Sequence, residues 1–171
     1  EVEINILAAD GCDPNLCGKH FGCNDTTEDD SSTQIDTMCV INDLKYTVVN
    51  TNDSPIELTK PKVLPQIKEK YKKIDFLLHG YTMAGYYPQC TVSLTKEEML
   101  KESQRVMKIN YERCMNYIKD LNPDFFMPFA GRYLLAGKLA KFNDRTANFP
   151  PIHAKKYLEN RNKLNFPLIK K

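Results

Sequence analysis

The chain has 171 residues, 42% of them hydrophobic and 27% charged, and its formal net charge is +2. This length suffices for one packed domain. The nearly balanced charge gives no general attraction to nucleic acid or to a membrane surface. No segment approaches the roughly 18 consecutive apolar residues of a membrane span. We therefore expect neither a nucleic-acid nor a membrane partner.

The cysteine pattern bears on the redox setting of the chain. Three of the six cysteines fall within twelve residues and the others are scattered. A secreted disulfide framework is denser for its length, so the pattern favours a reducing, cytoplasmic setting. Cys114 lies inside a helical pattern and is expected to be a small buried hydrophobic residue. The sequence opens at Glu1 without a Met, which indicates that it was processed, cut or started inside a longer one.

The first half of the chain is predicted to consist mainly of strands. Residues 2–9 alternate apolar and polar side chains and predict a strand. A long polar loop follows over 10–34, and loops of that length are usually functional or mobile. Two short runs, 37–41 and 45–50, flank Asn42-Asp43 and predict a β-hairpin.

The second half alternates helices and strands. Thr59 and Pro61 predict the cap and first turn of a helix that reaches Tyr71. The continuous apolar run 74–78 is typical of a strand buried on both faces. Thr95 and Glu98 form a capping box that opens a long amphipathic helix ending before Pro123. The remaining expected elements are a short buried strand at 125–129 and short helices at 134–142 and 152–162.

This order predicts an α/β fold. Strand–helix–strand repeats favour parallel pairing with right-handed crossovers, and the opening hairpin makes the sheet mixed. Sites in such sheets form at the carboxyl ends of the strands. Those ends are expected at Asn52-Asp53, at 79–81 and at 128–132.

Several side chains near these ends are candidates for chemistry. The carboxylate of Asp53 could bind a hard metal ion, or it could simply cap a turn. His79 could contact a substrate, or it could be a hydrogen-bonded structural histidine. Aromatic rings could stack on a sugar or a base, or plug loops against the sheet; these are Tyr81, Tyr86, Tyr87 and Tyr133. Arg132 and Lys138 could meet a phosphate or carboxylate, or remain solvated.

The polar loop holds a second candidate metal cluster. Its members are of types that suit zinc, namely Cys12, Cys17, His20 and Cys23. Their spacing is not that of a standard zinc knuckle. A plain structural loop, or a loop that covers an active site, is the alternative.

Linked motifs resemble a known family. The sequence Ile-Asp-Phe-Leu-Leu-His-Gly-Tyr ends one expected strand, between a strand ending in Asn-Asp and a long helix. This order resembles the C-terminal half of the metallo-β-lactamase superfamily, and within it the corresponding domain of CMP-N-acetylneuraminate hydroxylase and its bacterial relatives. The motifs that carry the resemblance are Ile35-Asp36-Thr37 through Asn52-Asp53, Tyr86-Tyr87-Pro88-Gln89-Cys90, and the run Pro128 to Leu139.

The resemblance implies a fold and an activity. Residues 1–150 would form the C-terminal half of an αββα sandwich, a mixed sheet with helices on its outer face, and 151–171 a C-terminal helix and basic tail. The parent would be a metal-dependent enzyme, hydroxylase-like and acting on a sugar nucleotide or related anion. A metal-dependent hydrolase of the lactonase or phosphodiesterase type is the alternative, as is a non-catalytic half-domain. The substrate-binding residues would be His79, Tyr81, Tyr87, Gln89, Arg132, Tyr133 and Lys138.

Two departures limit what this chain would do alone. The motif His-x-His-x-Asp-His is absent, and Ala130 stands where hydrolase branches carry a metal-binding histidine. We therefore expect Asp53 to bind iron or zinc only in the intact parent, and no tightly bound metal in this chain alone. The expected partners are the N-terminal half of the domain or a second copy, with a possible electron-donor module.

A half sandwich would also leave its inner sheet face uncovered. Burying several hundred Å2 of apolar surface contributes on the order of 10 kcal/mol, which is comparable to the whole stability of a domain. We therefore expect the chain to be stable only with its missing half, as a dimer, or inside a larger protein.

Overall fold

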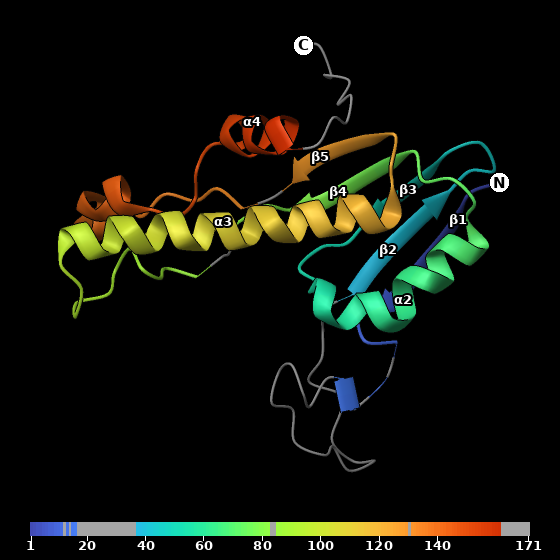
Figure 1. Ribbon diagram of the computed structural model, residues 1–171, viewed down its shortest axis with the longest axis horizontal. Coiled ribbons are helices and arrows are strands. Elements are labelled where there is room, and N and C mark those ends of the chain that lie inside the picture. The colour runs from blue at the N-terminus through green and yellow to red at the C-terminus, as the bar shows by residue number, and fades with distance from the viewer. Residues whose placement is uncertain (12, 14, 17–36, 83–84, 130, 162–171) are drawn as a thin grey trace. The chain divides into compact units, whose positions relative to one another are not determined.

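A computed structural model describes residues 1–11, 13, 15–16, 37–82, 85–129 and 131–161 (Figure 1). The chain divides into two compact units. Unit 1 contains Glu1–His79 and Asn116–Met127, and unit 2 contains Gly80–Met115 and Pro128–Lys171. The long helix α3 (Lys96–Leu121) contributes its last turns to unit 1 and the rest to unit 2.

Unit 1 is built on a five-stranded sheet in the order β1-β2-β3-β4-β5. β1 and β2 pair antiparallel, with Ile4 opposite Ile41, and β2 and β3 form the expected antiparallel hairpin. β3 and β4 pair in parallel, and β5 points the same way as β4 in Figure 1. The expected α/β class and mixed sheet are therefore confirmed. The strands are β1 (Glu3–Ala8), β2 (Thr37–Asn42), β3 (Thr47–Asn50), β4 (Phe76–Gly80) and β5 (Phe125–Phe129).

Helix α2 (Ile56–Lys70) begins three residues before the expected cap at Thr59. Pro55 occupies the N-cap in an extended conformation, with φ of −76°. The Thr59 hydroxyl does not cap the helix, because it donates to the carbonyl of Pro55 one turn back, at 3.3 Å. Pro61 and Pro65 both lie inside the helix and are exposed.

One face of the sheet is a closed core. Met38, Val40, Val49 and Leu77 are fully buried on it. They alternate along their strands with side chains on the other face, as the two-residue period of a strand requires. α2 lies across β1 and β2 in Figure 1. Its buried residues complete this core: Ile56, Leu58, Thr59, Val63, Leu64 and Ile67.

The opposite face is apolar and largely uncovered. Ile4 is 62% exposed, Ile6 63%, and Ile41 and Phe125 are each 38% exposed. Phe76 stacks on Phe125 with ring centroids 6.1 Å apart. The register places Ile4, Ile41 and Phe76 on this face, together with half-buried Val48 and Leu78. Phe125 joins them through its stacking on Phe76.

Two strands that continuous apolar runs marked as the buried type are not covered on both faces in this chain. β4 is not buried on both faces, because Phe76 and Leu78 are only half-buried while Leu77 and His79 are buried. β5 is not a buried strand either, since its burial runs from exposed at Phe125 to half-buried beyond it. Continuous apolar runs marked these strands, but a run cannot show whether both faces are covered.

Unit 2 contains residues 96–115 of α3, a 3₁₀ helix (Gly137–Arg145) and α4 (Pro151–Arg161). The capping box is present: Glu98 accepts from the Thr95 backbone N–H at 2.8 Å, and Thr95 Oγ1 accepts from the Glu98 N–H at 3.3 Å. Cys114 is fully buried, as expected. The helix expected over 134–142 is instead the 3₁₀ helix. No helix in the described part of the chain is long and apolar enough to cross a membrane.

Candidate functional site

Asp53 lies in a tight turn directly after β3. The backbone N–H of Ser54 donates to the carbonyl of Thr51 at 3.0 Å. Asn52 has a positive φ of 48°, and its N–H donates to Asn50 Oδ1 at 2.9 Å. Asp53 is exposed, and among the described residues nothing forms an ion pair or hydrogen bond with its carboxylate. The turn therefore presents this carboxylate to solvent or to another molecule.

A buried contact joins the ends of β3 and β4 beneath this turn. Thr51 Oγ1 lies 2.6 Å from His79 Nδ1, and both residues are buried. The His79 ring also packs on the Tyr117 ring of α3, with centroids 4.5 Å apart. These contacts give His79 a structural role at the strand end. Its expected contact with a substrate stays a prediction.

Tyr117 fixes the other side of the turn. Its hydroxyl donates to the Ser54 carbonyl at 2.8 Å and lies 2.8 Å from Thr59 Oγ1. Thr51, Ser54, Thr59 and Tyr117 are all buried. A hydrogen bond between buried groups is costly to break, because each group would be left without a partner away from water. The turn that carries Asp53 is thus held by a buried network on both sides.

A metal site built from the described residues alone does not fit. Within that part of the chain, no three side chains of the metal-ligating types His, Cys, Asp and Glu lie together. Asp53 could supply a single metal ligand. The other ligands would have to come from outside the described residues. Five residues on which the sequence-based expectation depends lie outside the described residues: Ala130 and the cluster Cys12, Cys17, His20 and Cys23.

Comparison of the chain with family models, curated proteins and solved structures finds no match.

The other expected substrate residues belong to unit 2, and several of them make internal contacts. Gln89 is 1% exposed, and its amide donates to the carbonyl of Phe142 at 3.0 Å. The Tyr133 hydroxyl donates to the Gly85 carbonyl at 2.7 Å. Tyr81 is buried, and burial raises the pKa of its hydroxyl.

Three expected residues reach solvent. Tyr87 is exposed; its hydroxyl donates to Glu102 at 2.8 Å, and this bond raises the pKa of Tyr87. Arg132 and Lys138 are also exposed. Of the expected set in unit 2, these three side chains are the most available to a ligand. Their role in substrate binding stays a prediction.

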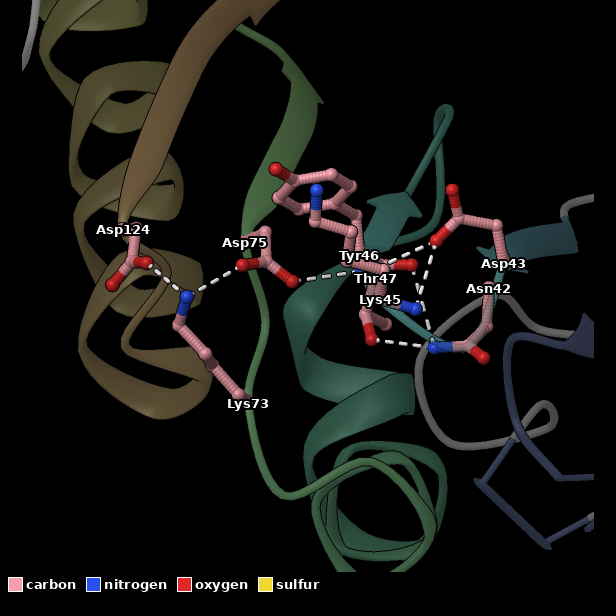
Figure 2. Close-up of polar contacts among 8 residues, drawn as sticks. All are labelled: Asn42, Asp43, Lys45, Tyr46, Thr47, Lys73, Asp75 and Asp124. Carbon is pink, nitrogen blue, oxygen red and sulfur yellow. Dashed lines mark hydrogen bonds and ion pairs between the residues drawn. The ribbon is translucent and has the colours of Figure 1, made fainter.

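Sequence reasoning missed a cavity at the opposite end of the sheet. It has a volume of about 360 Å3 and lies beside the turn between β2 and β3. Figure 2 shows one wall, in which Lys73 bridges Asp75 and Asp124, both at 2.6 Å. The run Lys70, Lys72, Lys73 was a signal in the sequence, but nothing in the sequence indicated that it faces the hairpin turn. The cavity is lined by Glu3, Asn42, Leu44, Lys45, Thr47, Lys70, Tyr71, Lys72, Lys73 and Asp75.

Proposed function

We propose that this chain is one layer of a metal-dependent enzyme with a metallo-β-lactamase-type sandwich. A second sheet would cover the uncovered face formed by Ile4, Ile6, Ile41, Phe76 and Phe125. That face is the observation on which the proposal depends, because sheets are normally closed by a second layer. Five strands about 4.8 Å apart, each about five residues long, give a face of roughly 400 Å2. Covering it contributes on the order of 10 kcal/mol.

In this proposal Asp53 supplies one ligand to an iron or zinc ion, and the other layer supplies the rest. Support comes from its exposed carboxylate, which has no partner among the described residues, and from the buried network that fixes its turn. The resemblance suggests a hydroxylase-like reaction on a sugar nucleotide or related anion, with a separate electron donor. Metal-dependent hydrolysis of the lactonase or phosphodiesterase type is the alternative chemistry.

A second candidate is a non-catalytic half-domain that only pairs with another layer. It is favoured by the lack of a three-ligand group within the described part of the chain. The occupant of the face would be the N-terminal half of the domain or a second copy of this chain. Both candidates use the uncovered face, and they differ only in whether Asp53 binds a metal.

The face is tested by a charge substitution with a matched control. The full chain should bind a hydrophobic dye or associate in sedimentation velocity. Ile4→Lys with Ile6→Lys should abolish both effects. Leu44→Lys with Val92→Lys adds the same charge at apolar side chains that are 82% and 100% exposed elsewhere, and should change neither. A monomer with a cooperative melt and no dye binding would overturn the proposal.

The metal role is tested in the protein that contains both layers. Metal content would be measured by mass spectrometry after dialysis against a weak chelator. Asp53→Asn should weaken metal affinity by more than about 100-fold, because loss of an outer partner alone costs about 10–100-fold. Glu69→Gln, at an exposed carboxylate on α2, should leave it unchanged. A wild-type protein without metal would favour the non-catalytic half-domain, and an unchanged metal affinity after Asp53→Asn would remove Asp53 from the ligand set.

A further inference from the structure

We propose that the cavity beside the β2–β3 turn binds a compact dianion, such as a small phosphate monoester. The cavity lies within unit 1, at the end of the sheet opposite the Asp53 turn. It is independent of the proposed metal role of Asp53. Its volume of about 360 Å3 lies in the range of roughly 300–1,000 Å3 that is typical of small-molecule sites.

Two lysines of the cavity wall are available to an anion. Four lysines line the cavity together with two carboxylates, Glu3 and Asp75. Asp124 shares Lys73 with Asp75, and Asp43 lies in the turn that carries Lys45. Lys70 pairs with Glu3, and Lys73 pairs with Asp75. The two other lysines, Lys45 and Lys72, have no acidic partner in an ion pair among the described residues, and both are exposed.

The wall is fixed before any ligand arrives. One Asp43 oxygen accepts from the backbone N–H groups of Lys45 at 3.0 Å and Tyr46 at 2.7 Å, as Figure 2 shows. The Asn42 amide donates to Thr47 Oγ1 at 2.8 Å. The Lys45 ammonium lies 4.9 Å from the centroid of the Tyr46 ring. Because the turn that carries Lys45 is already ordered, an anion would not have to organise its backbone.

The far wall is held by buried contacts. Asp75 is 8% exposed, and its carboxylate accepts from the Thr47 N–H at 2.8 Å. This bond links the start of β3 to the segment that carries Lys72 and Lys73. The hydroxyl of Tyr71 lies 2.6 Å from the Asn5 amide that donates to it, which ties the same segment to β1. Lys45 and Lys72 therefore project from two anchored segments.

The lysines and the apolar lining of the cavity indicate which class of ligand it binds. Lysine ammonium groups bind phosphate as hydrated point charges, without the fixed geometry that arginine demands. Lys45 and Lys72, which have no acidic partner in an ion pair among the described residues, would supply two ammonium groups to the two negative charges of the ligand. Leu44 also lines the cavity and is 82% exposed, so it offers an apolar surface for a short carbon chain. A phosphate monoester and a dicarboxylate share the chemistry that this cavity recognises.

The test is a titration followed by ¹H–¹⁵N spectra of the full chain. Inorganic phosphate, succinate and chloride would be compared at constant ionic strength, because general screening must be held fixed. Phosphate should shift the amides of residues 44–47 and 70–75 with saturation, and chloride should not. Stronger binding of phosphate than of succinate would identify a phosphate site, and the reverse a carboxylate site.

Two double variants distinguish binding at the cavity from a general effect of positive charge on phosphate binding. Lys45→Gln with Lys72→Gln should weaken phosphate binding about tenfold, as expected for two exposed ionic contacts. Lys68→Gln with Lys119→Gln removes the same charge from exposed lysines of unit 1 outside the cavity, and should change binding less than about twofold. Equal weakening in both, an unchanged cavity variant, or equal shifts with chloride would overturn the proposal.

Discussion

The hydroxyl oxygen of Thr51 lies 2.6 Å from Nδ1 of His79, and this contact joins the carboxyl ends of two parallel strands. The same hydroxyl donates to the Leu78 carbonyl at 3.2 Å, while the Thr51 N–H donates to that carbonyl at 3.0 Å. The pairing of β3 and β4 is thereby extended one residue beyond β3. The Asp53 turn starts from this fixed point.

Thr51→Val should destabilise the chain because it removes the hydroxyl while keeping the shape of the side chain. A buried polar partner left unsatisfied costs about 1–3 kcal/mol. Urea unfolding of the full chain would measure the loss. Thr37→Val, on half-exposed Thr37 of β2, is the control and should change stability by no more than about 0.5 kcal/mol. Equal stability of the two variants would contradict a structural role for the Thr51–His79 contact.

Tyr117→Phe should also destabilise, since the Tyr117 hydroxyl donates to Ser54 and contacts Thr59. We expect a loss of about 1–2 kcal/mol in urea unfolding. Tyr46→Phe removes a hydroxyl from a residue that is 50% exposed, and should be nearly neutral. If the Asp53 turn is a ligand site, Tyr117→Phe should weaken metal binding as well. A destabilised variant with unchanged metal affinity would confine Tyr117 to a structural role.

Local patterns predicted most of the elements. The alternation at residues 2–9, the Asn42-Asp43 turn and the Thr95–Glu98 capping box each depend on neighbours within a few residues, and β1, the hairpin and the start of α3 follow from them. The start of α2 was misplaced because Pro55 fixes the N-cap by its own φ, while the Thr59 hydroxyl bonds backward. The start of a helix and the hydrogen-bond partner of a hydroxyl both depend on the folded surroundings, which a local sequence pattern does not contain.

The candidate site was predicted only in part. The position of Asp53 at a strand end followed from strand order, but the network beneath it did not. Tyr117 is 63 residues from Ser54, and Thr51 is 28 residues from His79. The cavity was missed for the same reason, since Lys70 is 67 residues from its partner Glu3. Contacts between residues so far apart in the sequence form only in the folded chain. They produce no periodic pattern that could be recognised in the sequence.

Cys114 should resist alkylation in the folded chain. Burial raises the pKa of its thiol to about 12, and the side chain is fully buried. The reactive species is the thiolate, so both its fraction and its access are low. Cys39 and Cys90 are half-buried and free and should react faster with iodoacetamide in mildly alkaline buffer. Peptide mass mapping would follow each site, and rapid native labelling of Cys114 would contradict its burial.

Asp75 should make a defined contribution to stability in acid. Burial raises its pKa, but the hydrogen bonds from Lys73 and from the Thr47 N–H outweigh burial and hold the pKa below its ordinary value of 3.8. The unfolded chain then binds more protons than the folded chain between the two pKa values, so stability rises with pH there. The contribution is complete above the unfolded pKa and is lost as pH falls through the folded one.

Asp75→Asn isolates this contribution from the other carboxylates. At about pH 6 the variant should be less stable than the wild type by about 1 kcal/mol or less, because Lys73 is largely exposed and solvent screens the pair. The difference should shrink as the pH falls below 3.8, since protonation removes the same charge from the wild type. Asp53→Asn is the control for the loss of a carboxylate, and at about pH 6 it should change stability by no more than about 0.5 kcal/mol, because that carboxylate is exposed and has no partner among the described residues. Urea unfolding between about pH 6 and about pH 2.5 measures all three proteins across this titration, and a difference that stays constant down to the lowest pH would show that the Asp75 charge does not stabilise the fold.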